Sequence, residues 1–273
     1  MDTKRKVAIV TGGASGIGKA ICEELITQQV FVIIADVNKI EGKVVEDELN
    51  RQQNCARYEY VDVADHVSME ELVRDTFNEH GRLDYLFNNA GITMYGELYD
   101  VSIEDWNHII DINLWGVIHG TQIGYKLMKE QGFGHIVNTS SAAGLGPSPL
   151  TAPYSATKHA IVGLTTSLHY EAKEHGVKVS VLCPTTFVDT PIFSNAKAIN
   201  MDKHKMIQQL KKQKLMTPEK LAKIAINGVH QNAPIICPMP MRRTMDIFFS
   251  LFPYAHSKLM DYVCKVGRRA RIS

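Results

Sequence analysis

The sequence predicts an α/β fold, a doubly wound parallel sheet of about seven strands with helices on both faces. Short apolar runs alternate along the chain with longer amphipathic stretches, which is the pattern of strands linked by covering helices. The run at 30–35 is continuously apolar, as expected for a strand buried on both faces of a sheet. At 273 residues the chain is long enough for one large core, and one large domain or two small ones are the options.

The same alternation gives the elements in order. The predicted strands are 6–11, 30–36, 57–61, 85–88, 135–139, 178–183 and 235–237. The predicted helices are 17–28, 39–52, 66–80, 102–131, 154–175 and 217–231. Right-handed crossovers between these strands would place a ligand at the carboxyl ends of the strands. After residue 190 the alternation weakens, and an insertion at 191–216 and a C-terminal tail fall outside the repeating unit.

Composition excludes several classes of protein. With 45% hydrophobic and 22% charged residues the chain is an ordinary globular protein, not a disordered one. No stretch approaches the length of a membrane-spanning helix, and the first apolar run is too short for a secretory leader. The five cysteines form no CxxC pair and no zinc spacing, which favours reduced thiols, so we expect a cytoplasmic protein. We expect neither a metal site nor a nucleic-acid partner.

A glycine-rich loop, Thr11-Gly-Gly-Ala-Ser-Gly-Ile-Gly18, joins the first predicted strand to the first predicted helix. Gly12 permits a tight turn, Gly16 lets the backbone approach a pyrophosphate, and Gly18 allows close packing of the helix. The helix N-terminus adds free N–H groups and a positive dipole end. We therefore expect this loop, with Ser15 and Ile17, to bind the phosphates of a dinucleotide.

An acidic residue, Asp36, ends the second predicted strand. A carboxylate there can accept hydrogen bonds from both ribose hydroxyls of an adenosine, and it would repel a 2′-phosphate. No Arg or Lys stands at 13–15 or at 37 to offset that charge, although Lys39 is near in sequence. We therefore predict NAD as the cofactor rather than NADP. The alternative interpretation of Asp36 is an ordinary helix-capping acid.

Tyr154 and Lys158 are four residues apart at the start of a predicted helix that Pro153 can open. Residues at this spacing share a helix face, so an ammonium would lie near a phenol. A nearby cation lowers the pKa of a tyrosine, and a positively charged nicotinamide would add to that effect. This pair alone is a weak signal, because the YxxxK spacing is common by chance.

The motifs occur together in a fixed order: Gly12, Gly16 and Gly18, then Asp36, Asp62-Val63, Asn88-Asn-Ala-Gly91, Asn113, Ser141 and Tyr154-Ser-Ala-Thr-Lys158. This set, with its TGxxxGxG and YxxxK motifs, resembles the short form of the short-chain dehydrogenase/reductase family over about residues 5–190. The resemblance implies a single-domain Rossmann fold and a nicotinamide cofactor.

The resemblance also implies roles for these residues. Tyr154 would be the general acid/base, Lys158 would hold the nicotinamide ribose, Ser141 would orient the substrate oxygen, and Asn113 would support a water in a proton relay. Asp62 and Val63 would contact the adenine. The adenosine side would be lined, and the central strand steadied, by Asn88, Asn89, Ala90 and Gly91. Ser140 is the neighbouring candidate for the serine role. The alternative interpretation is structural: Asn88 and Asn113 as buried amides, and Ser141 as a cap at a strand end.

One segment departs from the family pattern. After the sixth strand the family has Pro-Gly, whereas this chain has Pro184-Thr185 and one apparent additional residue. The resemblance still implies that Pro184, Val188 and Thr190 contact the nicotinamide. The conformation of the loop around Thr185 is left open.

Three variable segments, 92–97, 142–150 and 191–216, are expected to cover the substrate, the last of them as a lid. Their apolar side chains favour a hydrophobic, lipid-, steroid- or retinoid-like secondary alcohol or its ketone, and hence a role in lipid metabolism. Beside Ser141 and Tyr154, the predicted substrate contacts are Met94, Leu145, Phe187 and Phe193. One alternative is an NADPH-dependent reductase of 3-oxoacyl groups on a carrier or coenzyme A. Another is a non-catalytic NAD-binding scaffold protein.

Charge divides the chain into two unlike parts. Residues 1–195 hold 15 Lys and Arg against 25 Asp and Glu, a net charge of −10, whereas residues 196–273 hold 15 against 4, a net charge of +11. We expect a catalytic domain over 1–240 and a basic amphipathic extension over 241–273, with a new helix after Pro253. This extension could lie in a membrane interface, pack on its own or a neighbouring subunit, or dock an acidic acyl carrier. The helical stretches 102–131 and 154–175 predict a homodimer or homotetramer by the same resemblance.

Overall fold

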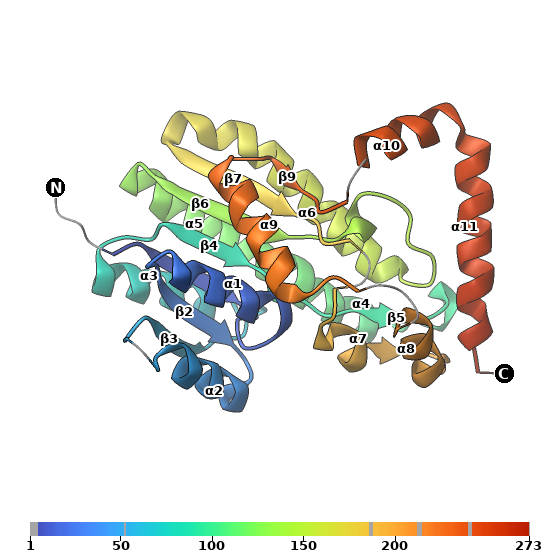
Figure 1. Cartoon of the computed structure of the whole chain (residues 1–273), viewed down its shortest axis with the longest axis horizontal. Helices are drawn as coiled ribbons and strands as arrows, with labels where there is room; N and C mark the ends of the chain where they lie inside the picture. The colour runs from blue at the N-terminus through green and yellow to red at the C-terminus, as the bar shows by residue number, and fades with distance from the viewer. Residues whose placement is uncertain (1–4, 52, 186–187, 212–214, 240–241, 273) are drawn as a thin grey trace.

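The computed structural model describes residues 5–51, 53–185, 188–211, 215–239 and 242–272 (Figure 1). Its main sheet has seven strands in the order β3-β2-β1-β4-β6-β7-β9, and every neighbouring pair is parallel. The strands are β1 Val7–Thr11, β2 Phe31–Asp36, β3 Ala56–Tyr60, β4 Tyr85–Asn88, β6 Gly134–Thr139, β7 Val177–Leu182 and β9 Ile235–Ile236. The predicted doubly wound sheet is confirmed, with boundaries that shift by one residue at several ends.

Helices cover both faces of this sheet. One face carries α1 Gly16–Thr27, α2 Lys39–Leu49 and α9 Pro218–His230, and the other carries α3 His66–His80, α5 Gly116–Gln131 and α6 Ala152–Glu171. Successive side chains of a strand point to opposite faces, so Val10 packs with the first set and Ile9 with the second. Both residues are fully buried, which is why these strands are apolar throughout rather than alternating.

The predicted helix at 102–131 is two helices joined by a wider turn. Ser102 caps α4 Ile103–Ile110 by accepting the Asp105 N–H at 3.1 Å. Residues Asp111–Trp115 then form one π-helical turn before α5 begins. A π turn carries an additional residue and changes the direction of the side chains in it, and Asn113 is one of them. The predicted helix at 154–175 likewise ends in a 3₁₀ turn, Ala172–His175, after α6.

The insertion after β7 builds a small second layer that the sequence did not predict. It contains α7 Pro191–Asn195, β8 Lys197–Ala198 and α8 Lys203–Lys211. β8 pairs in parallel with β5 Met94–Tyr95, so two of the predicted substrate-covering segments are joined by a two-stranded sheet.

The C-terminal extension forms α10 Arg242–Leu251, α11 Pro253–Gly267 and a 3₁₀ turn, Arg268–Ala270. Figure 1 places α10 and α11 at the end of the domain that carries α7, α8 and β5. Backbone hydrogen bonds join the end of the extension to the insertion: the Asp202 N–H donates to the Ala270 carbonyl at 2.6 Å, and the Ile272 N–H to the Asn200 carbonyl at 3.0 Å. Within the described residues no helix has both the length and the apolar character needed to cross a bilayer.

Ion pairs also hold the extension on its own chain. Arg268 forms a two-pronged pair with Glu97, at 2.5 and 3.2 Å, and Arg271 lies 3.7 Å from Asp100. Packing on the same subunit was one of the predicted alternatives for the extension, and these contacts favour it. The apolar side chains around the α10–α11 junction, among them Phe248, Leu251 and Phe252, remain exposed.

Candidate active site

A cavity of about 1150 Å³ opens at the carboxyl ends of the strands. Its walls come from the loops after β1, β2, β3, β4, β6 and β7, and then from α7, α8 and α11. All the residues predicted to bind the cofactor line it, with the exception of Gly18: Gly12, Ser15, Gly16, Ile17, Asp36, Asp62, Val63, Asn89, Ala90, Gly91, Tyr154, Lys158, Pro184, Val188 and Thr190. Long-range packing therefore brings these dispersed motifs to one site.

The glycine loop at one end of the cavity has no room for side chains. Gly16 has a φ of +52°, a conformation that L-residues other than glycine rarely adopt. A Cβ on Gly18 would fall 2.0 Å from the carbonyl oxygen of Gly12, so this glycine shapes the loop from outside the cavity. The α1 helix begins at Gly16, so its unpaired N–H groups lie at the cavity, where a phosphate would be stabilised.

Asp36 ends β2 beside this loop. Its carboxylate accepts the backbone N–H of Ala14 at 3.1 Å and that of Asn38 at 3.0 Å, which fixes its orientation. Lys39 lies instead over the ring of Tyr60, 4.7 Å from the centroid, and does not line the cavity. Among the described residues that line the cavity, no cation stands near Asp36 in sequence.

The start of the loop after β4 is tied to β1. The Thr11 hydroxyl accepts the N–H groups of Asn89 and Ala90 at 2.9 and 3.1 Å, while Asn88 donates to Asn138 at 2.8 Å inside the core. Asn88 is thus a buried structural amide, as its alternative interpretation predicts. Asp62, two residues after the end of β3, accepts the Ala64 N–H at 3.0 Å.

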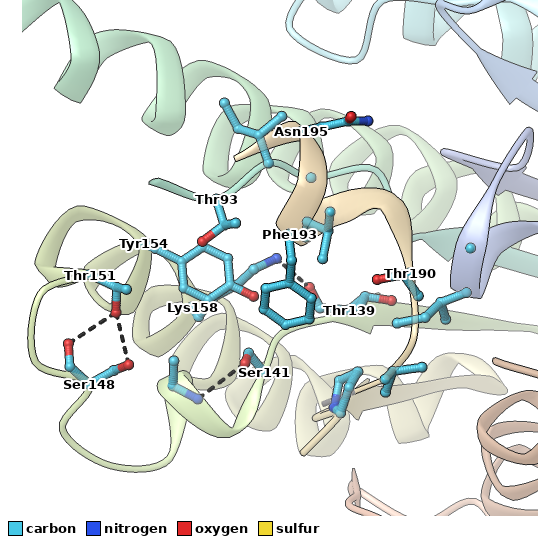
Figure 2. Close-up of a pocket in the computed structure, with 18 of the residues that line it drawn as sticks. Thr93, Thr139, Ser141, Ser148, Thr151, Tyr154, Lys158, Thr190, Phe193 and Asn195 are labelled. Atoms are coloured by element: carbon cyan, nitrogen blue, oxygen red, sulfur yellow. Dashed lines mark hydrogen bonds between the residues drawn. The ribbon is translucent and has the colours of Figure 1, made fainter. Parts of the chain in front are cut away.

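Tyr154 and Lys158 stand on the first turns of α6, and both reach the cavity beside Ser141 (Figure 2). The Lys158 ammonium lies 5.5 Å from the centroid of the Tyr154 ring and donates to the Thr139 carbonyl at 2.9 Å. Ser141 follows β6, where its hydroxyl accepts the Ala143 N–H at 3.2 Å. The three side chains predicted to do the chemistry therefore meet in space.

Burial changes the acidity of this group of residues. It raises the pKa of Tyr154, an effect that a hydrogen bond with Ser141 partly offsets. It lowers the pKa of Lys158 to about 8, because an ammonium loses hydration there. The shift in the pKa of Tyr154 is therefore opposite in direction to the one predicted from its spacing to Lys158, and burial is its largest cause. A positively charged group in the cavity would act in the opposite direction.

The two serines after β6 have different surroundings. Ser140 is buried and donates to the Lys158 carbonyl at 2.7 Å, which anchors α6 to the sheet. Asn113 is also fully buried and does not line the cavity: it accepts the Ile92 N–H at 2.8 Å and donates to the Ile92 carbonyl at 2.9 Å. It lies behind Gly91, where an added Cβ would be 3.1 Å from its Oδ1 and 3.4 Å from the Lys158 Nζ.

The loop after β7, whose sequence departs from the family pattern, lines the cavity. The Ala142 N–H donates to the Pro184 carbonyl at 2.8 Å, and Thr185 lines the cavity. Thr190 lies against the phosphate loop, since a Cβ on Gly16 would be 3.2 Å from the Thr190 Cβ. Phe187, one of the predicted substrate contacts, lies outside the described residues.

The substrate end of the cavity differs in part from the prediction. Phe193 from α7 lines the cavity near Tyr154, as expected (Figure 2). Met94 does not: it is 2% exposed, and the alternation of β5 turns the next residue, Tyr95, into the cavity instead. Leu145 packs against a core cluster with Val117 and Ile161, and it does not line the cavity either. Both were predicted as substrate contacts, and neither lies among the residues that line this cavity.

Sequence reasoning also missed part of the outer wall. Five residues of α11 and the turn after it line the cavity with Met201 and Met206: Met260, Val263, Val266, Gly267 and Arg269. The signal that could have found them is the spacing of Met260, Val263 and Val266, three residues apart on one helix face.

A family model described as short chain dehydrogenase matches residues 6–200. The chain belongs to the short-chain dehydrogenase/reductase family. The chain is 33% identical over 269 residues to 15-hydroxyprostaglandin dehydrogenase [NAD(+)] of Rattus norvegicus, and the match covers 93% of this chain and 98% of that protein. It is 37% identical over 187 residues to 3-alpha-(or 20-beta)-hydroxysteroid dehydrogenase of Mycobacterium bovis, covering 68% and 70%.

Among solved structures, the chain resembles a short chain dehydrogenase/reductase from Burkholderia phymatum in complex with NAD. The TM-score is 0.81 with 27% sequence identity, over 90% of this chain and 92% of that one. The protein is therefore an oxidoreductase of this family with its single-domain fold.

Proposed function

We propose that this oxidoreductase interconverts a hydrophobic secondary alcohol and its ketone with NAD. One observation carries the proposal: Tyr154, Ser141 and Lys158 converge in a cavity whose outer walls are mainly apolar. A fixed proton donor beside an apolar pocket is what hydride transfer at a carbinol carbon needs from a protein.

The residues present fit a dinucleotide. The phosphate loop leaves a cradle that side chains on Gly16 or Gly18 would disturb, and a helix N-terminus faces it. Asp36 would hold the adenosine ribose, Asp62 and Val63 the adenine, and Asn89, Ala90 and Gly91 the adenosine side. At the other end, Lys158 would hold the second ribose, and Pro184, Val188 and Thr190 the carboxamide. When bound, the cofactor supplies the hydride acceptor or donor.

Tyr154 would exchange the proton on the substrate oxygen while Ser141 orients that oxygen by a hydrogen bond. Lys158 would stabilise the phenolate form of the tyrosine through its charge. Asn113 would act indirectly, by positioning the residues around it. It hydrogen bonds to the backbone of Ile92 and lies behind Gly91, near the Lys158 ammonium. We propose for it a positioning role, and a water in the relay remains part of that proposal.

NAD is favoured over NADP by the fixed carboxylate of Asp36 and by the engagement of Lys39 with Tyr60. The hydroxyprostaglandin and hydroxysteroid dehydrogenases similar to this chain have secondary alcohols of lipids in their names, which supports the substrate class and a place in lipid metabolism.

Two alternatives remain testable. An NADPH-dependent reductase of 3-oxoacyl carriers or coenzyme A esters would need a cation at the adenosine ribose, where Asp36 stands. A non-catalytic NAD-binding scaffold would not require a proton donor such as Tyr154 in the cavity. The exposed Trp115, on the first of the two long helical stretches, supports the proposed homodimer or homotetramer. Peripheral membrane contact through the extension is supported by the exposed apolar side chains at the α10–α11 junction.

The decisive experiment follows NADH absorbance with a panel of steroid, retinoid and hydroxyacyl alcohols, with NAD and NADP in parallel. We expect turnover with NAD and an apolar secondary alcohol. Preference for NADPH would favour the 3-oxoacyl reductase. If NAD binds in calorimetry but no alcohol or ketone reacts, the scaffold interpretation holds.

A further inference from the structure

We infer that the cavity holds the carboxylate end of its substrate on Arg269, so that the substrate is an apolar chain or ring system that ends in a carboxylate. The inference rests on the proposed function for the identity of the reacting group, but the anion site itself is independent of that chemistry. The observation behind it is Arg269, an exposed residue that lines the cavity and has no acidic partner among the described residues.

Three arginines follow one another in the last turn of the chain, and they are used differently. Arg268 is paired with Glu97 and Arg271 with Asp100, so both are committed to the loop after β5. Arg269 lines the cavity and has no acidic partner among the described residues. The two pairs, with the buried Ala270 between them, fix the turn that carries Arg269.

The surroundings of Arg269 define what it could bind. The neighbouring part of the wall is apolar, formed by Met201, Met206, Met260, Val263 and Val266. The acidic residues that line the cavity are Asp36 and Asp62, which lie at the ends of β2 and β3, at the adenosine end. An unpaired guanidinium beside apolar walls is therefore available to a ligand from the substrate side.

The charge balance favours a carboxylate over a phosphate. A guanidinium binds a carboxylate through two parallel hydrogen bonds, and one positive charge matches one negative charge. A phosphate or a coenzyme A ester carries more negative charge and would need further cations. The only other cation among the described residues lining the cavity is Lys158, which belongs to the reacting centre.

The test compares straight-chain secondary hydroxy fatty acids with their methyl esters, which keep the chain and lose the charge. For the wild-type enzyme we expect kcat/KM about tenfold higher for the acids, carried by KM. Arg269→Gln should remove that preference by raising KM for the acids, with KM for the esters within about twofold. Lys265→Gln is the matched control, because Lys265 is exposed on α11 and does not line the cavity.

A second measurement separates this inference from the proposed function. Binding of an unreactive saturated fatty acid and its methyl ester to the NAD complex is followed by calorimetry. Tighter binding of the acid that Arg269→Gln abolishes would support the anion site, even if no alcohol were oxidised. Equal binding and equal kcat/KM for acid and ester in the wild type would overturn it, even if turnover were fast. Preference for acyl coenzyme A over the free acid would also overturn it.

Discussion

The two parts of the chain reach the same cavity by different means. Up to about residue 190 the contacts come from loops at the strand ends, each built on a local motif. Beyond it the contacts come from helices held by long-range ion pairs: Lys197 with Asp105, Arg268 with Glu97, and Arg271 with Asp100. Each pair joins a cation of the positive part to an acid of the negative part. The charge asymmetry thus serves, at least in these pairs, to fasten one part on the other.

Tyr154→Phe should have the largest effect and would test the motif-built part. Loss of a placed proton donor should lower kcat by about 10²- to 10⁴-fold, while NAD binding stays nearly unchanged. The measurement is steady-state turnover together with calorimetric NAD binding. Tyr170→Phe, an exposed tyrosine farther along α6, is the matched control. A variant that retains a third of the activity would exclude Tyr154 as the proton donor.

The pH profile sharpens this prediction. Oxidation needs the phenolate as a base, and burial raises the pKa of Tyr154, so the oxidation rate should increase with pH. Reduction needs the protonated phenol, so its rate should decrease with pH over the same range. Measured kcat against pH in both directions gives the two slopes. Slopes that persist in Tyr154→Phe would assign the titration to another group.

Asp36→Ala should have the next largest effect. Removal of the carboxylate eliminates repulsion of a 2′-phosphate and the hydrogen bonds to the ribose, so the ratio of kcat/KM for NAD over NADP should fall by about tenfold or more. Asp47→Ala, exposed on α2, controls for the loss of an acid. A wild-type enzyme that already prefers NADPH would contradict this interpretation of Asp36.

Deletion of residues 241–273 would test the second part. Among the described residues, the deletion removes the part of the cavity wall that α11 and the turn after it supply. We therefore expect kcat/KM for the alcohol to fall by about tenfold because KM increases. NAD should still bind, because its predicted contacts lie outside the deleted segment. Thermal unfolding and gel filtration report whether the sheet and the oligomer persist. Vesicle binding by the full-length protein that increases at low salt and disappears on deletion would instead favour a membrane role. Unchanged kcat/KM would show that the extension is not a wall.

Asp105→Asn should have the smallest effect. The hydrogen bond from Lys197 holds the pKa of Asp105 below its usual range, so the pair stabilises the fold above the ordinary carboxyl pKa and is lost as pH falls through the lowered one. Because Lys197 is 62% exposed, solvent screening limits the loss of stability to less than about 1 kcal/mol at neutral pH. Denaturant unfolding at pH 7 and pH 3 measures it, with exposed Asp111→Asn as the control. An equal loss at both pH values would exclude the ion pair as its cause.

The sequence by itself determined the parts whose structure is local. The glycine loop, the acid that ends β2 and the i, i+4 pair of α6 depend on residues within one or two elements. The alternation of apolar runs was enough to identify the strands and the doubly wound class of the sheet, but not the order of the strands. The position of the π turn at Asp111–Trp115 was not predicted, since a periodic pattern does not distinguish an α-helix from one with an inserted residue.

Only the tertiary structure decided the outer wall and its charges. Arg268 and Glu97 are 171 residues apart, and no local pattern specifies which acid a cation will meet. The same holds for Met94 and Tyr95, because the face of a two-residue strand depends on its pairing with β8. Contacts between residues far apart in the sequence form only when the whole chain packs. The orientation of each helix or strand in the outer wall depends on the elements against which it packs.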